Sequence, residues 1–136
     1  PTLVFKQAAD GGMGDFVMGT GSPGGATIIQ FVVKTLVGVL DWGLDAQQAT
    51  SMVDFGAGNS ATTNVGIEHP NIISSNRGAD DPLISGLRAL GHTVTGTTAQ
   101  SSGTSTIVRI TRDNGLSAWS GGADPRREGL VLGDGY

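Results

Sequence analysis

The sequence predicts an α+β fold in which helices cover one face of an antiparallel sheet. Two pairs of short β-prone runs are each joined by a turn-rich segment, and one long apolar stretch has helical length. The chain has 136 residues, which is enough for one domain with a hydrophobic core. Because it has no internal repeat and no change in composition, we expect a single domain over residues 1–136.

The predicted strands form two hairpins and two isolated runs. The first hairpin turns through the polar, glycine-rich residues 7–15, and the second turns at Asp113-Asn114-Gly115, a sequence that favours a tight turn. Residues 54–64 and 121–136 are rich in glycine and polar residues and predict loops. In chain order, the predicted strands are residues 2–6, 16–20, 65–68, 93–98, 105–111 and 116–119.

The longest predicted helix covers residues 27–40 and ends before Gly43. Its apolar residues lie on nearly all faces, which predicts that the helix is buried against a sheet. The stretch contains Lys34 and is too short and too polar to span a bilayer.

Two shorter helices have sequence signals at their ends. Asp45 and Gln48 have the spacing of a capping box and predict a helix that runs to about Met52. Pro82 is placed to open another helix, which we expect to end at Gly91.

Composition excludes several classes of function. The net charge of −4 argues against a nucleic-acid surface, and the absence of cysteine excludes disulfides and thiol chemistry. No cluster of residues implies a metal or an organic cofactor, so we expect neither. The chain begins at Pro1 with no initiator methionine or signal peptide, and we expect this start to be a cut or processing point.

The segment Gly21-Ser22-Pro23-Gly24-Gly25 is the most informative motif. It lies between a predicted strand and the long helix, where free backbone N–H groups and the helix dipole can hold an anion or a developing oxyanion. The alternative is a tight turn shaped by Pro23 and the glycines. The motif is neither a phosphate-binding P-loop nor a dinucleotide fingerprint, since the residues that those need do not follow.

The remaining candidates have weaker signals. His69 and His92 lack partners at metal-ligand spacing, and His92 after a helix fits a surface residue. The Asp124-Pro125-Arg126-Arg127 run predicts a structural ion-pair cluster or, alternatively, part of a substrate site. Pro1 could act as a secondary-amine base only with arginines nearby. Turn or helix-start roles are expected for Asp10, Asp15, Asp80 and Asp81, and no base is recognisable beside the hydroxyls of Ser22, Ser101, Ser102 and Thr104.

Several of these pieces together resemble, in order, the C-terminal part of the small subunit of γ-glutamyltranspeptidases. The resemblance covers nearly the whole chain, and the glycine motif and the Asp-Pro-Arg tail are its most specific parts. The matching segments are residues 1–6, 19–29, 39–45 with Gln48-Ala49, Leu87 with residues 91–94, residues 122–129 and the terminal Gly135-Tyr136. Residues 50–60 depart from the family, which commonly has a proline before Phe55.

The resemblance implies an N-terminal-nucleophile hydrolase fold, a four-layer α/β/β/α sandwich of which this chain forms a portion. It implies an autoprocessed enzyme in which an N-terminal threonine attacks a γ-glutamyl amide, forms an acyl-enzyme, and transfers the group to water or an amino acid. By position, the resemblance implies that Gly24 and Gly25 supply the oxyanion-hole N–H groups and that Ser22 and Pro23 shape the substrate-binding loop. The threonine, the double serine and the residues that hold the substrate are expected upstream of Pro1.

These implications define the expected partners and the alternatives. The partners are the rest of the same precursor, meaning the large subunit and the N-terminal part of the small subunit, and a γ-glutamyl small molecule. A periplasmic or extracellular location is expected from the resemblance alone. The alternatives are a related amidase or acylase of the cephalosporin or poly-γ-glutamate type, a homologue that has lost activity, and a non-catalytic scaffold domain. A scaffold predicts a monomer without open sheet edges, whereas an enzyme segment predicts exposed strand edges and apolar surface.

Overall fold

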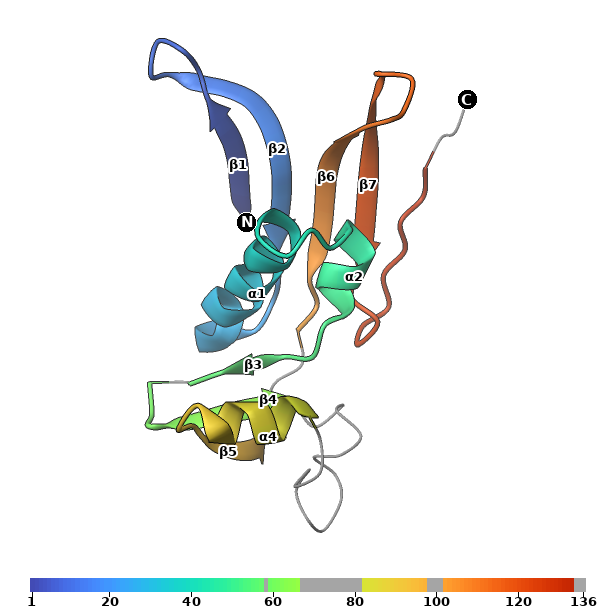
Figure 1. Cartoon of the computed structure of the whole chain (residues 1–136). Coiled ribbons are helices and arrows are strands. Elements are labelled where there is room, and N and C mark those ends of the chain that lie inside the picture. The colour runs from blue at the N-terminus through green and yellow to red at the C-terminus, as the bar shows by residue number, and fades with distance from the viewer. Residues whose placement is uncertain (58, 67–81, 98–101, 134–136) are drawn as a thin grey trace.

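The computed structural model describes residues 1–57, 59–66, 82–97 and 102–133 (Figure 1). Its larger part is a four-stranded antiparallel sheet with the strand order β1-β2-β6-β7. The strands are β1 (Thr2–Gln7), β2 (Met13–Gly21), β6 (Ser105–Thr111) and β7 (Ser117–Ala123). Both predicted hairpins are therefore confirmed.

Strand β7 is longer than the sequence predicted. We expected a loop from residue 121, but Gly121 pairs with Ile107 and Ala123 pairs with Ser105. Glycine has a low strand propensity, so the pattern of residues did not reveal this end of the strand. The same ladder places Gly21, the last residue of β2, opposite Ser105.

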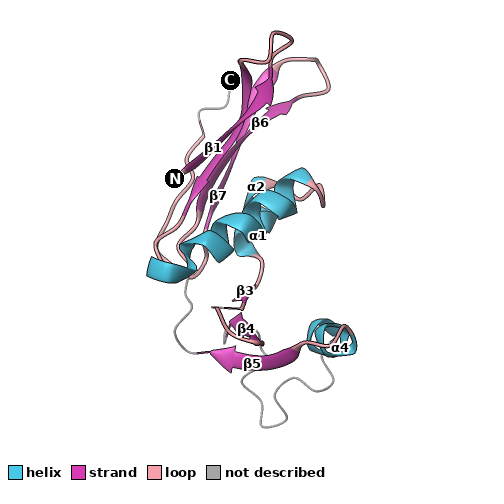
Figure 2. Ribbon diagram, turned by 90° about the vertical axis from the view of Figure 1, so that its left-hand side faces the viewer, coloured by secondary structure: helices cyan, strands magenta, loops and turns pink. Residues whose placement is uncertain are grey.

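Two helices, α1 (Ile28–Leu40) and α2 (Ala46–Ser51), cover one face of this sheet (Figure 2). The capping box of α2 is confirmed, since the Gln48 backbone N–H donates to the Asp45 carboxylate and the Asp45 N–H donates to the Gln48 side chain. Helix α2 lies very close to β7, because a Cβ atom added at Gly122 would be 2.3 Å from the Ala46 carbonyl oxygen.

The prediction that the long helix is buried on nearly all faces is wrong. Phe31 and Thr35 are fully buried on the side of α1 that faces the sheet, whereas Ile29 is 73% exposed and Val33 is 50% exposed. The outer face of α1 is apolar, so composition alone could not tell which side the sheet covers. Within the described parts of the chain, no helix is long and apolar enough to cross a membrane.

A second, smaller sheet has the order β3-β4-β5 and packs with helix α4. Val65, Ile84 and Val94 form its core. Strands β4 and β5 run parallel, which requires a crossover, and α4 lies in the segment that connects them. The elements are β3 (Phe55–Gly56), β4 (Thr62–Gly66), α4 (Pro82–Ala89) and β5 (Thr93–Thr97).

This small sheet corrects two predictions. The expected loop at 54–64 contains β3 and the start of β4, and the antiparallel arrangement expected throughout does not extend to the β4–β5 pair. Short strands with glycine and asparagine have little periodicity, so their pairing depends on tertiary contacts. Residues 67–68 of the predicted strand lie outside the described residues, whereas the predicted helix and the strand at 93–98 are present as α4 and β5.

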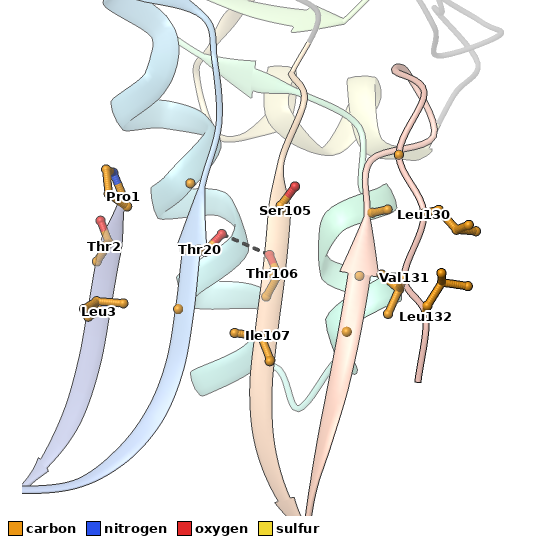
Figure 3. Close-up of a pocket in the computed structure, with 16 residues that line it drawn as sticks. Pro1, Thr2, Leu3, Thr20, Ser105, Thr106, Ile107, Leu130, Val131 and Leu132 are labelled. Carbon is orange, nitrogen blue, oxygen red and sulfur yellow. Dashed lines mark hydrogen bonds between the residues drawn. The ribbon is translucent and has the colours of Figure 1, made fainter. Parts of the chain in front are cut away.

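The face of the larger sheet opposite the helices is apolar and open. Leu3 and Ile107 lie in one cross-strand row with Gly19 and Gly121, and the C-terminal segment, residues 130–132, runs along the same face (Figure 3). Leu3 is 64% exposed and Ile107 is 44% exposed. Strand β1 has only β2 as a neighbour among the described strands. Among the described residues, the larger sheet thus has an open edge at β1 and an apolar face with much exposed surface.

The space around two glycines predicts opposite effects of alanine on stability. Gly122→Ala places a methyl group against the Ala46 carbonyl and should lower the free energy of unfolding by about 1–3 kcal/mol. Gly86→Ala, in α4 with open space around it, should raise the free energy of unfolding by about 0.5–1 kcal/mol. Urea unfolding measures both, and a Gly122→Ala variant as stable as the wild type would contradict the packing.

Candidate functional site

The glycine loop, residues 21–25, connects the end of β2 to a 3₁₀ turn, Gly25–Thr27, that continues into α1. Gly24 has a φ of 144° and Gly25 has a φ of 57°, both in the region that side chains disfavour. A Cβ atom added at Gly24 would be 2.6 Å from the ring of the buried Phe31. Glycine is therefore required at position 24 by space and at both positions by conformation.

Hydrogen bonds to two carbonyl groups fix the orientation of this loop. The Ser22 hydroxyl donates to the Pro23 carbonyl oxygen at 2.7 Å. The Thr27 hydroxyl and backbone N–H donate to the Gly24 carbonyl oxygen at 2.7 and 3.1 Å. In a trans peptide the C=O and the following N–H point in opposite directions. The N–H groups of Gly24 and Gly25 consequently point away from these bonds.

Both of these N–H groups are available to a ligand. Gly24 and Gly25 are exposed, and no acceptor for either N–H is found in the part of the chain that the structure describes. They lie at the start of α1, where the helix dipole adds positive potential. The arrangement can hold an anion or the negative oxygen of a tetrahedral intermediate.

The glycine loop is attached to the neighbouring strand by a side chain. The backbone N–H of Gly103, two residues before β6, donates to the Ser22 hydroxyl oxygen at 3.0 Å. A Cβ atom added at Gly103 would be 2.5 Å from the Arg127 side chain and 2.9 Å from Pro23. Gly103 therefore lets the glycine loop and the C-terminal segment approach the same backbone.

Three consecutive N–H groups, those of residues 102–104, donate to side chains from three separate segments. The N–H of Ser102 donates to Asp54 at 3.0 Å and the N–H of Thr104 donates to Asp124 at 3.0 Å, on either side of the Gly103–Ser22 bond. Residues 102–104 thus connect the glycine loop with two buried carboxylates.

These carboxylates belong to a buried ion network of Lys34, Asp54, Asp124 and Arg126. The Lys34 ammonium is 2.8 Å from Asp54, and the Arg126 guanidinium is 3.5 Å from Asp54 and 3.0 Å from Asp124. Both cations also donate to the Met52 carbonyl oxygen. Of the two interpretations of the Asp-Pro-Arg run, the structure supports the structural ion-pair cluster for Asp124 and Arg126. Arg127 donates from Nε to the Ser102 carbonyl oxygen at 3.3 Å.

Burial and hydrogen bonding shift two pKa values in this network. Burial lowers the pKa of Lys34, although its hydrogen bond to Asp54 acts in the opposite direction. Burial alone would raise the pKa of Asp124, but hydrogen bonds from Ser102, Thr104 and Arg126 outweigh that effect and hold its pKa below the ordinary value. The ionised carboxylate of Asp124 is thus the form that the fold stabilises.

The sequence did not predict the roles of Lys34 and Asp54. Lys34 lies between Val33 and Thr35 in a mostly apolar run, and a lysine in such a run signals either a solvent-facing position or a buried pair. Its side chain is 1% exposed, and that of Asp54 is fully buried. Because its partner lies 20 residues away beyond another helix, no local pattern could have paired them.

The remaining hydroxyl and histidine candidates take structural roles. Ser102 and Thr104 are buried, and the Ser102 hydroxyl donates to Asp124. His92 is exposed, as expected, and its Nδ1 atom lies 2.7 Å from the Thr63 hydroxyl. His69 and Ser101 lie outside the described residues. In the described ranges, no three His, Asp or Glu side chains are grouped so that they could hold a metal ion.

The two described acidic residues of the first hairpin, and Pro1, contact residues of the larger sheet and its turns. Asp10 accepts the N–H of Gly12, and Asp15 forms an exposed ion pair with Arg109 at 3.1 Å. Asp80 and Asp81 lie outside the described residues. Pro1 is exposed beside Gly21, at the base of the glycine loop.

The low pKa of Asp124 predicts how a charge-removing substitution depends on pH. Asp124→Asn should lower the free energy of unfolding by about 3–5 kcal/mol at pH 7, because it leaves Arg126 without one buried partner. Because the pKa of Asp124 is lower in the folded protein than in the unfolded chain, ionised Asp124 stabilises the fold at pH values above the unfolded pKa of about 3.9. This stabilisation is lost as the pH falls from that value through the folded-state pKa. The difference between variant and wild type should therefore shrink below about pH 4.

Denaturant unfolding between pH 3 and pH 7 measures this dependence. The matched control is Asp15→Asn, which removes an exposed ion pair and should change stability by about 1 kcal/mol or less. A loss in Asp124→Asn that is the same at every pH would contradict the assigned pKa shift.

Comparison with known proteins identifies the family. The family model described as γ-glutamyltranspeptidase matches residues 1–133. Among curated proteins, the glutathione hydrolase proenzyme of Bacillus subtilis (strain 168) is 29% identical over 140 residues, covering 98% of this chain and 19% of that protein. The chain thus spans about a fifth of the length of this relative.

Solved structures share the fold. A mutant of Helicobacter pylori γ-glutamyltranspeptidase has a TM-score of 0.68 at 20% identity, covering 93% of this chain and 60% of that chain. Cephalosporin acylase from Bacillus halodurans has a TM-score of 0.64 at 19% identity, covering 90% of this chain and 21% of that chain. The predicted α+β, N-terminal-nucleophile hydrolase fold is confirmed. The chain belongs to the γ-glutamyltranspeptidase family.

Proposed function

We propose that this chain works as one portion of a γ-glutamyltransferase or glutathione hydrolase, to which it supplies the oxyanion hole. The observation that carries the proposal is the pair of exposed N–H groups at Gly24 and Gly25, which have no acceptor among the described residues and are oriented by the Ser22 and Thr27 hydroxyls. Such preorganised donors are the usual source of oxyanion stabilisation in acyl transfer.

In the proposed reaction, a threonine at the N-terminus of the small subunit attacks the γ-glutamyl carbonyl carbon, with its own α-amine as base. The carbonyl oxygen becomes negative in the tetrahedral intermediate and accepts hydrogen bonds from Gly24 and Gly25. The protonated α-amine gives its proton to the nitrogen of the scissile C–N bond, this bond breaks so that the amine leaves, and an acyl-enzyme remains. Water or an amino acid, deprotonated by the same α-amine, then attacks the acyl carbon, and the threonine oxygen leaves with that proton. The threonine and the residues that hold the substrate belong to the rest of the precursor.

The position of the first strand supports this division of the site. β1 pairs with β2 so that Thr2 lies opposite Thr20, and Pro1 lies next to Gly21. Residues that precede Pro1 in a longer protein would therefore emerge beside the glycine loop. This is where the double serine expected upstream of Pro1 would meet a substrate held by Gly24 and Gly25.

The open apolar face supports a partner made of the same precursor. Leu3, Ile107 and Trp119 are each more than 40% exposed on strands that a complete domain would cover. In a four-layer sandwich, the second sheet packs on this face at about 10 Å. A single domain over residues 1–136, acting as a non-catalytic scaffold, would leave this surface in water.

We include a periplasmic or extracellular location in the proposal, on the strength of the family membership alone.

A second candidate is an acylase that acts on a different amide. The similarity to cephalosporin acylase favours it, because the same fold serves that enzyme. The two candidates share the oxyanion hole and differ in the residues that hold the acyl group. Two assays of the full-length protein separate the candidates. One uses a γ-glutamyl anilide, and the other uses a cephalosporin whose acyl side chain is attached by an amide bond. Turnover of the cephalosporin alone would overturn the γ-glutamyl assignment.

The oxyanion role predicts a large loss of activity from a substitution at Gly25. In the full-length protein, Gly25→Val should lower kcat for a γ-glutamyl anilide by about 10²–10³-fold, because it moves the donor N–H groups. Steady-state kinetics measures this loss. The matched control is Gly43→Val, since Gly43 has a similar φ of 68° and equally open surroundings but lies in a remote turn. Equal kcat values for the two variants would remove the site assignment.

If this chain supplies the oxyanion donors and the rest of the precursor supplies the nucleophile, the chain alone should be inactive. The 136-residue chain should not cleave a γ-glutamyl anilide, whereas the processed full-length protein should, because the nucleophile lies in the rest of the precursor. Turnover by the isolated chain at the rate of the full-length protein would contradict the proposal.

A further inference from the structure

We propose that the hydroxyl groups of Ser22 and Thr27 are positioning groups that fix the planes of the two peptides whose N–H groups hold the oxyanion. The inference rests on the proposed function for its kinetic consequence. Neither hydroxyl is assigned to substrate, because each donates its proton to a loop carbonyl.

Ser22 fixes the peptide between Pro23 and Gly24. The Gly103 N–H donates to the Ser22 oxygen at 3.0 Å, which leaves the hydroxyl proton free to bind the Pro23 carbonyl at 2.7 Å. Rotation of this peptide would break the bond to Ser22 and turn the Gly24 N–H away from its direction. The Ser22 hydroxyl therefore connects the donor at Gly24 to the backbone before β6.

Thr27 fixes the next peptide in the same way. The Gly24 carbonyl oxygen accepts both the Thr27 hydroxyl and the Thr27 N–H. The opposite end of this peptide is the Gly25 N–H, so its direction is set by the first turn before α1. One hydroxyl thus orients each donor.

Such restraints are needed because glycine has little conformational preference of its own. Gly24 and Gly25 both have positive φ, and peptides between such residues can rotate at little cost. Pro23 restricts only its own φ. Since an oxyanion donor is effective only at about 2.7–3.1 Å from the oxygen, a rotated peptide loses the interaction.

The test uses the full-length, processed protein and a γ-glutamyl anilide. Ser22→Ala and Thr27→Val should each lower kcat by about tenfold, less than the 10²–10³-fold loss of a complete donor, and leave KM within about twofold. Ser22→Thr and Thr27→Ser keep a hydroxyl and should restore kcat to within about threefold of the wild type. Ser85→Ala is the control, because Ser85 also donates to a carbonyl but lies in α4.

The kinetic outcomes decide the inference when the wild type is active. Loss of kcat in the two hydroxyl-deleted variants, with rescue by the two hydroxyl-retaining variants, supports it. Unchanged kcat in Ser22→Ala and Thr27→Val, while Gly25→Val is impaired, overturns the positioning role and leaves the proposed function standing. A loss that the hydroxyl-retaining variants do not restore also overturns it.

A crystal structure of the full-length Ser22→Ala protein decides the structural part without reference to activity. We expect the Pro23–Gly24 peptide to be rotated or to occupy two orientations. If the wild type has no γ-glutamyl activity, the proposed function fails, and this structure still tests the role of Ser22. A single peptide orientation identical to that of the wild type overturns the inference.

Discussion

The ion pairs and hydrogen bonds of the buried Asp54 carboxylate hold together the segments of this chain that lie next to the glycine loop. It binds Lys34 from α1, Arg126 from the segment after β7, and the backbone before β6. Buried ions are expensive to desolvate, and an ion pair repays that expense only when further hydrogen bonds satisfy its atoms. Here the Met52 carbonyl and the N–H of Ser102 provide such bonds. The network joins α1 to the segment before β6 and to the segment after β7.

For function, the consequence is that the buried ion network is linked to the glycine loop by a few hydrogen bonds. Residues 102–104 bond to both buried carboxylates and to Ser22, and the Ser22 hydroxyl donates to the Pro23 carbonyl within the glycine loop. From the other side, α1 contributes Lys34 to the network and begins at the loop. A site that must hold hydrogen-bond donors in fixed positions gains from such support, because small displacements weaken transition-state interactions strongly.

Local signals in the sequence predicted the features that depend on neighbouring residues. The capping box at Asp45, the turn at residues 113–115 and the glycine loop before a helix were all identified correctly as structural elements. The oxyanion role of Gly24 and Gly25 remains a prediction from the resemblance, now with a geometry that suits it. The two hairpins and the long apolar helix also indicated the right fold class.

Features that depend on distant partners could not be predicted. Lys34 and Asp54 pair across another helix, and the burial of Lys34 reverses the usual preference of lysine for the surface. The parallel pairing of β4 with β5 joins strands that the sequence separates by α4. The apolar outer face of α1 suggested full burial because the sequence cannot tell a face covered within the chain from one left open.

The most direct test of the proposed oxyanion hole is a crystal structure of the full-length protein with a γ-glutamyl analogue that forms a tetrahedral adduct on the nucleophile. We expect the oxygen of the adduct to lie about 2.7–3.1 Å from the backbone nitrogens of Gly24 and Gly25. An adduct whose oxygen binds other groups, with both glycine N–H groups directed to solvent, would contradict it.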